Sequence, residues 1–179
     1  MLLAFAPFIA FAVINHFATA TTALAVAALI SLVLIGRELV SGRSAKILEV
    51  GSCVLFSGLA VYAFVSNASW PVVGVKLAVD VGLLVIVLFS LIAKQPFTIQ
   101  YARESVPPEQ WTSPQFHRSN QLITLVWLAA FCAIVIADLT LFYVPEVPHK
   151  VSILLTVGAL YGAFKFTMIY SDKAKAHAI

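Results

Sequence analysis

The sequence predicts an all-α integral membrane protein, and three observations support this class. Only 11% of the 179 residues are charged and 61% are hydrophobic, whereas a soluble domain carries about a quarter charged residues. A chain with so little charge cannot cover a surface that faces water, so we expect its surface to face lipid. The apolar runs are about 20 residues long, which suits membrane-spanning helices and not the alternating strands of a barrel.

We expect a single domain over residues 1–179, built as a bundle of five full transmembrane helices plus a short N-terminal hydrophobic helix at residues 2–17. The five spans are predicted at residues 18–35, 47–65, 72–93, 122–144 and 151–170. The uncharged run up to Ile35 would reach about 50 Å as one helix, but the hydrocarbon core is about 30 Å thick. We therefore place a break at Asn15–His16. The alternative is six spans, in which residues 2–17 also cross the membrane.

Basic residues alternate between the two sides of this topology. The loops 36–46 and 94–120 carry three Lys or Arg residues each, and the tail after residue 170 carries two. The turns 66–71 and 145–150 carry none and one, respectively. Because basic loops stay on the cytoplasmic side, the pattern places loop 94–120 and the C-terminus in the cytoplasm.

Ionisable residues inside the spans are the first candidates for a site, because they are costly in lipid. Lys76 and Asp80 are one helical turn apart and are expected to pair. Asp138 lies about 9 Å below the outer end of its helix, and Lys150 follows in the adjacent turn. One hypothesis is an outward-facing polar pocket formed by Lys76, Asp80, Asp138 and Lys150. The other is a lysine that extends to the interface and carboxylates that hydrogen-bond between helices to fix packing.

The long polar loop 94–120 interleaves aromatic with basic residues and is the second candidate. Its predicted contacts are Phe97, Tyr101, Arg103, Trp111 and Arg118. One interpretation is an interfacial segment on the cytoplasmic leaflet, near anionic lipid. The other is a docking surface for a membrane or cytoplasmic partner. The two interpretations are compatible.

The sequence contains no arrangement that indicates an enzyme. No nucleophile–base set and no metal-ligand spacing is present, so we expect no catalytic, cofactor-binding or metal-binding residues. Cys53 and Cys132 lie inside apolar runs, where cysteines usually only pack. The basic residues flank the spans, so we expect no nucleic acid as a partner. Gly158 and Gly162 form a GxxxG motif, which either packs inside the bundle or supports a homo-oligomer.

Several short segments, spread over most of the chain, together resemble one known family. The segments are Phe5–Ile9 with the Ala/Thr-rich run Ala18–Ala28, Lys76, Lys94–Phe97, Val106–Trp111, the spacing of Trp127, Phe131 and Asp138, and His149–Lys150. This pattern resembles the bacterial septation protein A family of small inner membrane-spanning proteins. The chain carries extra residues around 112–121 and has Asp138 where that family has an amide, so the resemblance is to a divergent member.

The resemblance implies a non-enzymatic protein of the inner membrane that acts in cell division or envelope homeostasis. Its expected partners are the lipid bilayer and other membrane proteins of the division or envelope machinery. The alternative function is a small transporter or channel subunit that uses the polar pocket around Lys76, Asp80 and Asp138.

Overall fold

The computed structural model describes residues 2–66, 71–144, 146 and 148–176, and every regular element within them is helical. The chain forms two compact units, Met1–Ile86 and Val87–Ile179, and each is described by itself. The expectation of a single domain stays a prediction. Most of the predicted turn 66–71 and part of the turn 145–150 lie outside the described residues.

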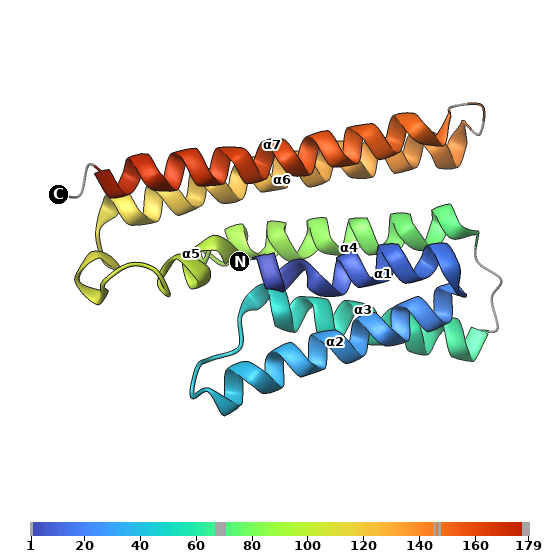
Figure 1. The fold of residues 1–179 in the computed structure, drawn as a ribbon, viewed down its shortest axis with the longest axis horizontal. Helices are drawn as coiled ribbons and strands as arrows, with labels where there is room; N and C mark the ends of the chain where they lie inside the picture. The colour runs from blue at the N-terminus through green and yellow to red at the C-terminus, as the bar shows by residue number, and fades with distance from the viewer. Residues whose placement is uncertain (1, 67–70, 145, 147, 177–179) are drawn as a thin grey trace. The chain divides into compact units, whose positions relative to one another are not determined.

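Figure 1 shows the helices of both units. The first unit contains η1 (Leu2–Phe5), α1 (Ala6–Phe17), α2 (Ala20–Val40), α3 (Ile47–Ser66) and most of α4 (Val72–Ile92). The second unit contains the end of α4, then α5 (Phe97–Ala102), η2 (Pro108–Gln110), α6 (Pro114–Tyr143) and α7 (His149–Ala176).

Five of these helices are long and apolar enough to cross a membrane, namely α2, α3, α4, α6 and α7. A shorter apolar helix covers Leu3–Phe17. The prediction of an all-α bundle with five full spans and a short N-terminal hydrophobic helix is therefore confirmed. A helix of that shorter length falls below the roughly 20 residues that a span requires.

The break in the long N-terminal apolar run lies slightly later than predicted. α1 continues through Asn15–His16 and ends at Phe17. Thr19 then caps α2, because its hydroxyl accepts the backbone N–H of Thr22 at 3.3 Å. This side-chain acceptor satisfies a helix-terminal donor and so sets the start of α2.

Aromatic and small apolar residues form the core where α1, α2 and α3 meet. The rings of Phe8 and Phe11 lie 4.9 and 5.9 Å from the ring of Phe56. Leu24 and Ala27 of α2 are completely buried in the same cluster. The short helix α1 is thus held in the first unit by apolar packing.

Two glycines bring α3 and α4 close together. A methyl group at Gly51 would lie 2.8 Å from the Ile86 side chain, and one at Gly82 would collide with Leu55. The absence of a side chain at each glycine leaves room for a large side chain of the facing helix.

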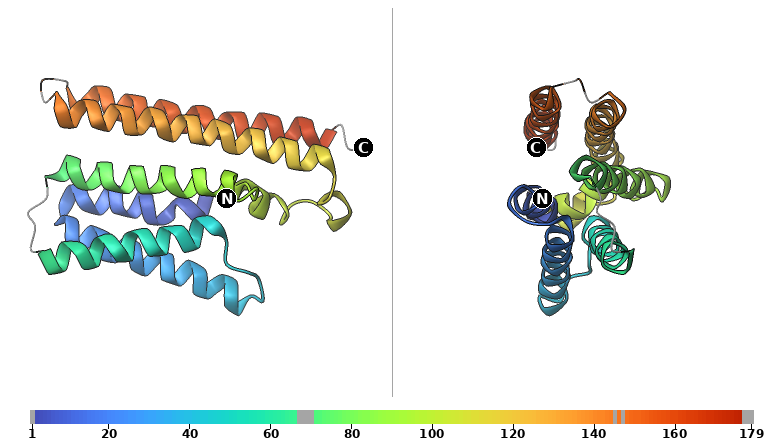
Figure 2. Two further views of the ribbon diagram at one scale, coloured as in Figure 1. Left: turned by 180° about the vertical axis from the view of Figure 1, so that it is seen from behind. Right: turned by 90° about the vertical axis from the view of Figure 1, so that its right-hand side faces the viewer.

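Helices α6 and α7 form a long antiparallel pair in the second unit, seen from two directions in Figure 2. α6 begins at Pro114, well before the predicted span at residue 122. Ser113 accepts the N–H of Phe116 at 3.1 Å, and Pro114 occupies a first-turn position that needs no N–H donor. The predicted loop 94–120 therefore includes the first turns of α6, together with α5 and η2.

The short helix α5 is fixed to α6 by buried hydroxyl groups. The Thr98 hydroxyl lies 2.8 Å from the Thr124 hydroxyl and donates to the Asn120 carbonyl at 2.9 Å. On the other side, the N–H of Phe97 donates to Ser90 Oγ at 3.2 Å. The segment after α4 therefore packs back against a membrane-spanning helix.

Candidate functional site

Lys76 and Asp80 form the ion pair that their spacing predicts. Lys76 Nζ lies 2.8 Å from Asp80 Oδ2, one turn further along α4. Their side chains are 38% and 21% exposed, so the ion pair is only partly buried. Each charge has its partner on the same helix, which lowers the cost of placing both in an apolar span.

Asp138 is completely buried at the contact between α6 and α7. Its Oδ1 accepts a hydrogen bond from the Ser152 hydroxyl at 3.3 Å. A second polar bridge joins the same helices further along, where Trp127 Nε1 donates to Thr167 Oγ1 at 3.0 Å. Asp138 thus contributes to helix packing, as the second hypothesis for these carboxylates expects.

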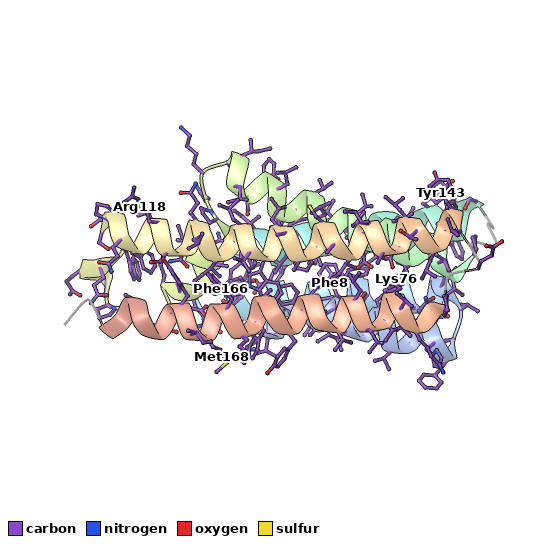
Figure 3. All side chains as sticks on the ribbon, turned by 90° about the horizontal axis from the view of Figure 1, so that it is seen from above. Phe8, Lys76, Arg118, Tyr143, Phe166 and Met168 are labelled. Carbon is purple, nitrogen blue, oxygen red and sulfur yellow. The ribbon has the colours of Figure 1, made fainter. Side chains whose placement is uncertain are left out.

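Figure 3 shows this helix pair from above, with Arg118 near one end of α6 and Tyr143 at the other. Phe166 lies on the side of α7 that faces α6, and Met168 points away. Lys150 is an exposed residue in the first turn of α7.

The four residues of the predicted pocket belong to different units. Lys76 and Asp80 lie in the first unit, and Asp138 and Lys150 lie in the second. The structure brings together the first two, and it connects Asp138 to Ser152. A pocket shared by all four residues stays a prediction.

A buried cluster of charges at the α2–α3 junction was missed by the sequence analysis. Lys46 Nζ lies 2.8 Å from Glu38 Oε2 and 3.6 Å from Glu49 Oε1. Glu38, Lys46 and Glu49 are only 6%, 6% and 5% exposed. Arg43, which is about half exposed, adds a contact from its Nε to Glu38 at 3.3 Å. One lysine side chain therefore contacts two buried carboxylates.

The end of α2 and the start of α3 create this cluster. Gly42 adopts the left-handed region at φ 69°, and the N–H of Arg43 donates back to the Glu38 carbonyl at 2.9 Å. This helix-ending motif turns the chain so that Lys46 returns toward Glu38. Glu49, at the third position of α3, accepts the Lys46 N–H at 3.4 Å as half of a capping box. In the sequence, Gly42 could have indicated the end of α2, and Glu49 could have indicated the start of α3.

The predicted contact residues of the polar loop divide into two groups. Phe97 and Tyr101 are 0% and 7% exposed, so both are buried in this structure. Their role as lipid or partner contacts stays a prediction. Both lie on the inner side of α5, where apolar side chains are removed from solvent. Arg103 and Arg118 are exposed and Trp111 is half-buried, so these three remain at the surface.

The GxxxG motif of α7 is open within the described part of its unit. A methyl group added at Gly158 or Gly162 would meet nothing within 4 Å in the described structure. Packing inside the bundle and a homo-oligomer both stay predictions.

Within the described ranges, no group of three or more His, Cys, Asp or Glu side chains is placed to hold a metal ion. Cys53 and Cys132 are free thiols. The expectations of no catalytic, cofactor or metal residues stay predictions.

No protein-family model, curated protein or solved structure matches this chain. The helices by themselves define the class, a multi-pass α-helical membrane protein whose apolar surface contacts the lipid bilayer. The resemblance to the septation protein A family stays a prediction.

Proposed function

We propose that this protein is a non-enzymatic scaffold of the bacterial inner membrane that acts in cell division or envelope homeostasis. It docks other membrane proteins on the exposed faces of its helices, with residues 94–120 and the C-terminus in the cytoplasm. The resemblance to septation protein A-like proteins supports the cellular role, and the alternation of basic loops supports the orientation.

The observation that carries the scaffold proposal is what the charged groups in and next to the spans contact. Glu38 contacts Lys46, Lys76 contacts Asp80, and Asp138 accepts from Ser152. The first contact connects the end of α2 to the turn that follows it, the second joins two residues on one face of α4, and the third joins α6 to α7. All three are structural roles. A transport path instead needs intramembrane charges that face water.

α7 provides the most open helix face for a partner. Its span has the smallest buried share of the five. Leu154 and Tyr161 are 73% and 63% exposed, and Gly158 and Gly162 leave room for a second helix to approach closely. The occupant is a helix of another membrane protein or of a second copy.

Site-specific photo-crosslinking in native membranes tests this proposal. A benzoylphenylalanine in place of exposed Tyr161 is expected to form protein adducts. The same group in place of Phe131, an aromatic residue that is only 2% exposed, is the matched control and should not. Adducts with lipid alone from Tyr161 and the other exposed α7 positions would refute docking on this helix. An unchanged cell length on depletion would refute the role in division.

A small transporter or channel subunit is the alternative function. The partial exposure of the Lys76–Asp80 pair favours it, because a charge pair inside a span is a functional candidate. The double variant Asp80→Asn/Asp138→Asn would then lose ion flux in proteoliposomes. Flux that persists in this variant would exclude those two carboxylates from transport.

A further inference from the structure

Arg103 and Trp111 form a cation–π contact at the surface of the connection between α4 and α6. The guanidinium carbon of Arg103 lies 5.4 Å from the centre of the Trp111 ring. Arg103 directly follows α5, and Trp111 directly follows η2. We call these two side chains the Arg–Trp platform. This distance is within the range in which a ring attracts a cation.

Local hydrogen bonds hold the Trp111 indole and the backbones of both residues in place. Trp111 Nε1 donates to the Val106 carbonyl at 2.9 Å, which fixes the plane of the indole. The backbone N–H of Trp111 donates to Pro108 at 3.1 Å, and that of Arg103 donates to Ile99 at 3.0 Å. A guanidinium that is already oriented loses less conformational freedom when it binds an anion.

The guanidinium of Arg103 is available for an anion. The side chain is exposed, and no carboxylate among the described residues pairs with it. A cation–π contact is an attraction between the charge and the ring, so it does not use up the N–H donors of the guanidinium. That planar fork matches two oxygens of a phosphate.

We propose that the Arg–Trp platform binds the phosphate of an anionic phospholipid headgroup. The proposal rests on the membrane class of the protein and not on the proposed docking function. Tryptophan prefers the membrane interface, where its ring lies among the headgroups. Arg103 beside it supplies the positive charge that an anionic headgroup requires.

The packing of the connection favours lipid over a soluble partner. Thr98 binds α5 to Asn120 and Thr124 of α6, so the chain on the N-terminal side of the platform lies against a membrane-spanning helix. Two exposed acidic residues in this part of the chain, Glu104 and Glu109, offset most of the charge of three exposed basic residues, Lys94, Arg103 and Arg118. This near balance means that overall charge does not attract lipid strongly, and the stacked geometry must provide the selectivity.

Native mass spectrometry of the full-length protein in detergent provides the test, with phosphatidylglycerol and phosphatidylcholine as competing probes. Arg103→Gln is expected to reduce the preference for phosphatidylglycerol about tenfold, which corresponds to about 1.4 kcal/mol. Arg37→Gln removes an exposed arginine outside the connection with the same change of charge and should keep the preference. Trp111→Phe retains a ring and should lose less than Trp111→Leu. Circular dichroism of each variant shows whether the helices remain folded.

Three results would overturn the proposal. The first is an unchanged lipid preference in folded Arg103→Gln. The second is an equal loss in Arg103→Gln and Arg37→Gln, which would indicate diffuse attraction without a site. The third is displacement of phosphatidylglycerol by inorganic phosphate, or protein adducts from a photo-crosslinker at Trp111 without lipid adducts.

Discussion

Buried acids are stabilised in different ways in the two units. At the α2–α3 junction, the Lys46 ammonium contacts both Glu38 and Glu49. In the α6–α7 pair, Asp138 is equally buried but accepts a hydrogen bond from the neutral hydroxyl of Ser152. The first arrangement places a cation beside two acids, and the second includes a hydrogen bond from a neutral group on the neighbouring helix.

The positions of these acids in their helices explain the difference. Glu38 and Glu49 lie in the last and first turns of α2 and α3, so a lysine in the short connection can reach both. Asp138 lies within a long helix whose neighbour presents Ser152. A lysine there would have to place its charge in the apolar span, which is costly. Three substitutions test this contrast.

The largest loss of stability is expected for Lys46→Met. This change keeps much of the side-chain volume but leaves Glu38 and Glu49 buried without their shared cation. Removal of one partner from a buried ion pair costs about 3–5 kcal/mol. Thermal or denaturant unfolding of the purified protein in detergent measures the change in the free energy of unfolding.

Arg43→Gln is the matched control for Lys46→Met, because the Arg43 side chain contacts Glu38 from an exposed position, at 47% exposure. It should cost at most about 1 kcal/mol. Equal losses in the two variants would contradict the role assigned to Lys46.

A medium effect is expected for Ser152→Ala. The substitution removes the donor to Asp138 while the carboxylate stays buried, which costs about 1–3 kcal/mol. Unfolding monitored by far-ultraviolet circular dichroism measures it. Ser171→Ala is the control, since the Ser171 hydroxyl donates to Met168 of its own helix at an exposed position. A Ser152→Ala variant as stable as the control would show that the interhelical bond contributes nothing.

The smallest effect is expected for Asp138→Asn. The amide oxygen can still accept from Ser152, so only the charge is lost, and stability should change by less than about 1 kcal/mol. Glu38→Gln is the comparison, because it removes the charge that Lys46 and Arg43 face, and it should cost about 1.5–3 kcal/mol. A larger loss in Asp138→Asn than in Glu38→Gln would reverse the contrast between the two units.

Much of the architecture was predictable because it depends on length and hydrophobicity. The five spans follow from apolar runs that must satisfy their backbone hydrogen bonds internally in lipid. The Lys76–Asp80 pair follows from a spacing of four residues on one helix, where the partners are neighbours in any packing. The helix boundaries were less accurate, because caps such as Ser113 and Gly42 set them and not the hydrophobicity that located the spans.

The sites depended on contacts that spacing does not determine. Loop 36–46 was interpreted only by its charge. Gly42 signals a turn there, but it does not indicate that Lys46 reaches Glu38. Phe97 and Tyr101 looked like surface aromatics, because the polar residues around them concealed the inner face of α5. The direction of the α7 glycines also depends on the rotation of that helix against α6.

The sequence by itself thus determined the class of this protein, its five spans and the ion pair within α4, because lipid imposes strict rules on length, charge and local hydrogen bonding. Only the tertiary structure decided that Lys46 joins two buried acids, that Asp138 accepts from Ser152, and that Arg103 stacks on Trp111. Each of these contacts joins residues brought together by a turn of the chain or by the packing of two helices. Hydrophobicity cannot specify that geometry, since many arrangements of apolar helices bury similar areas.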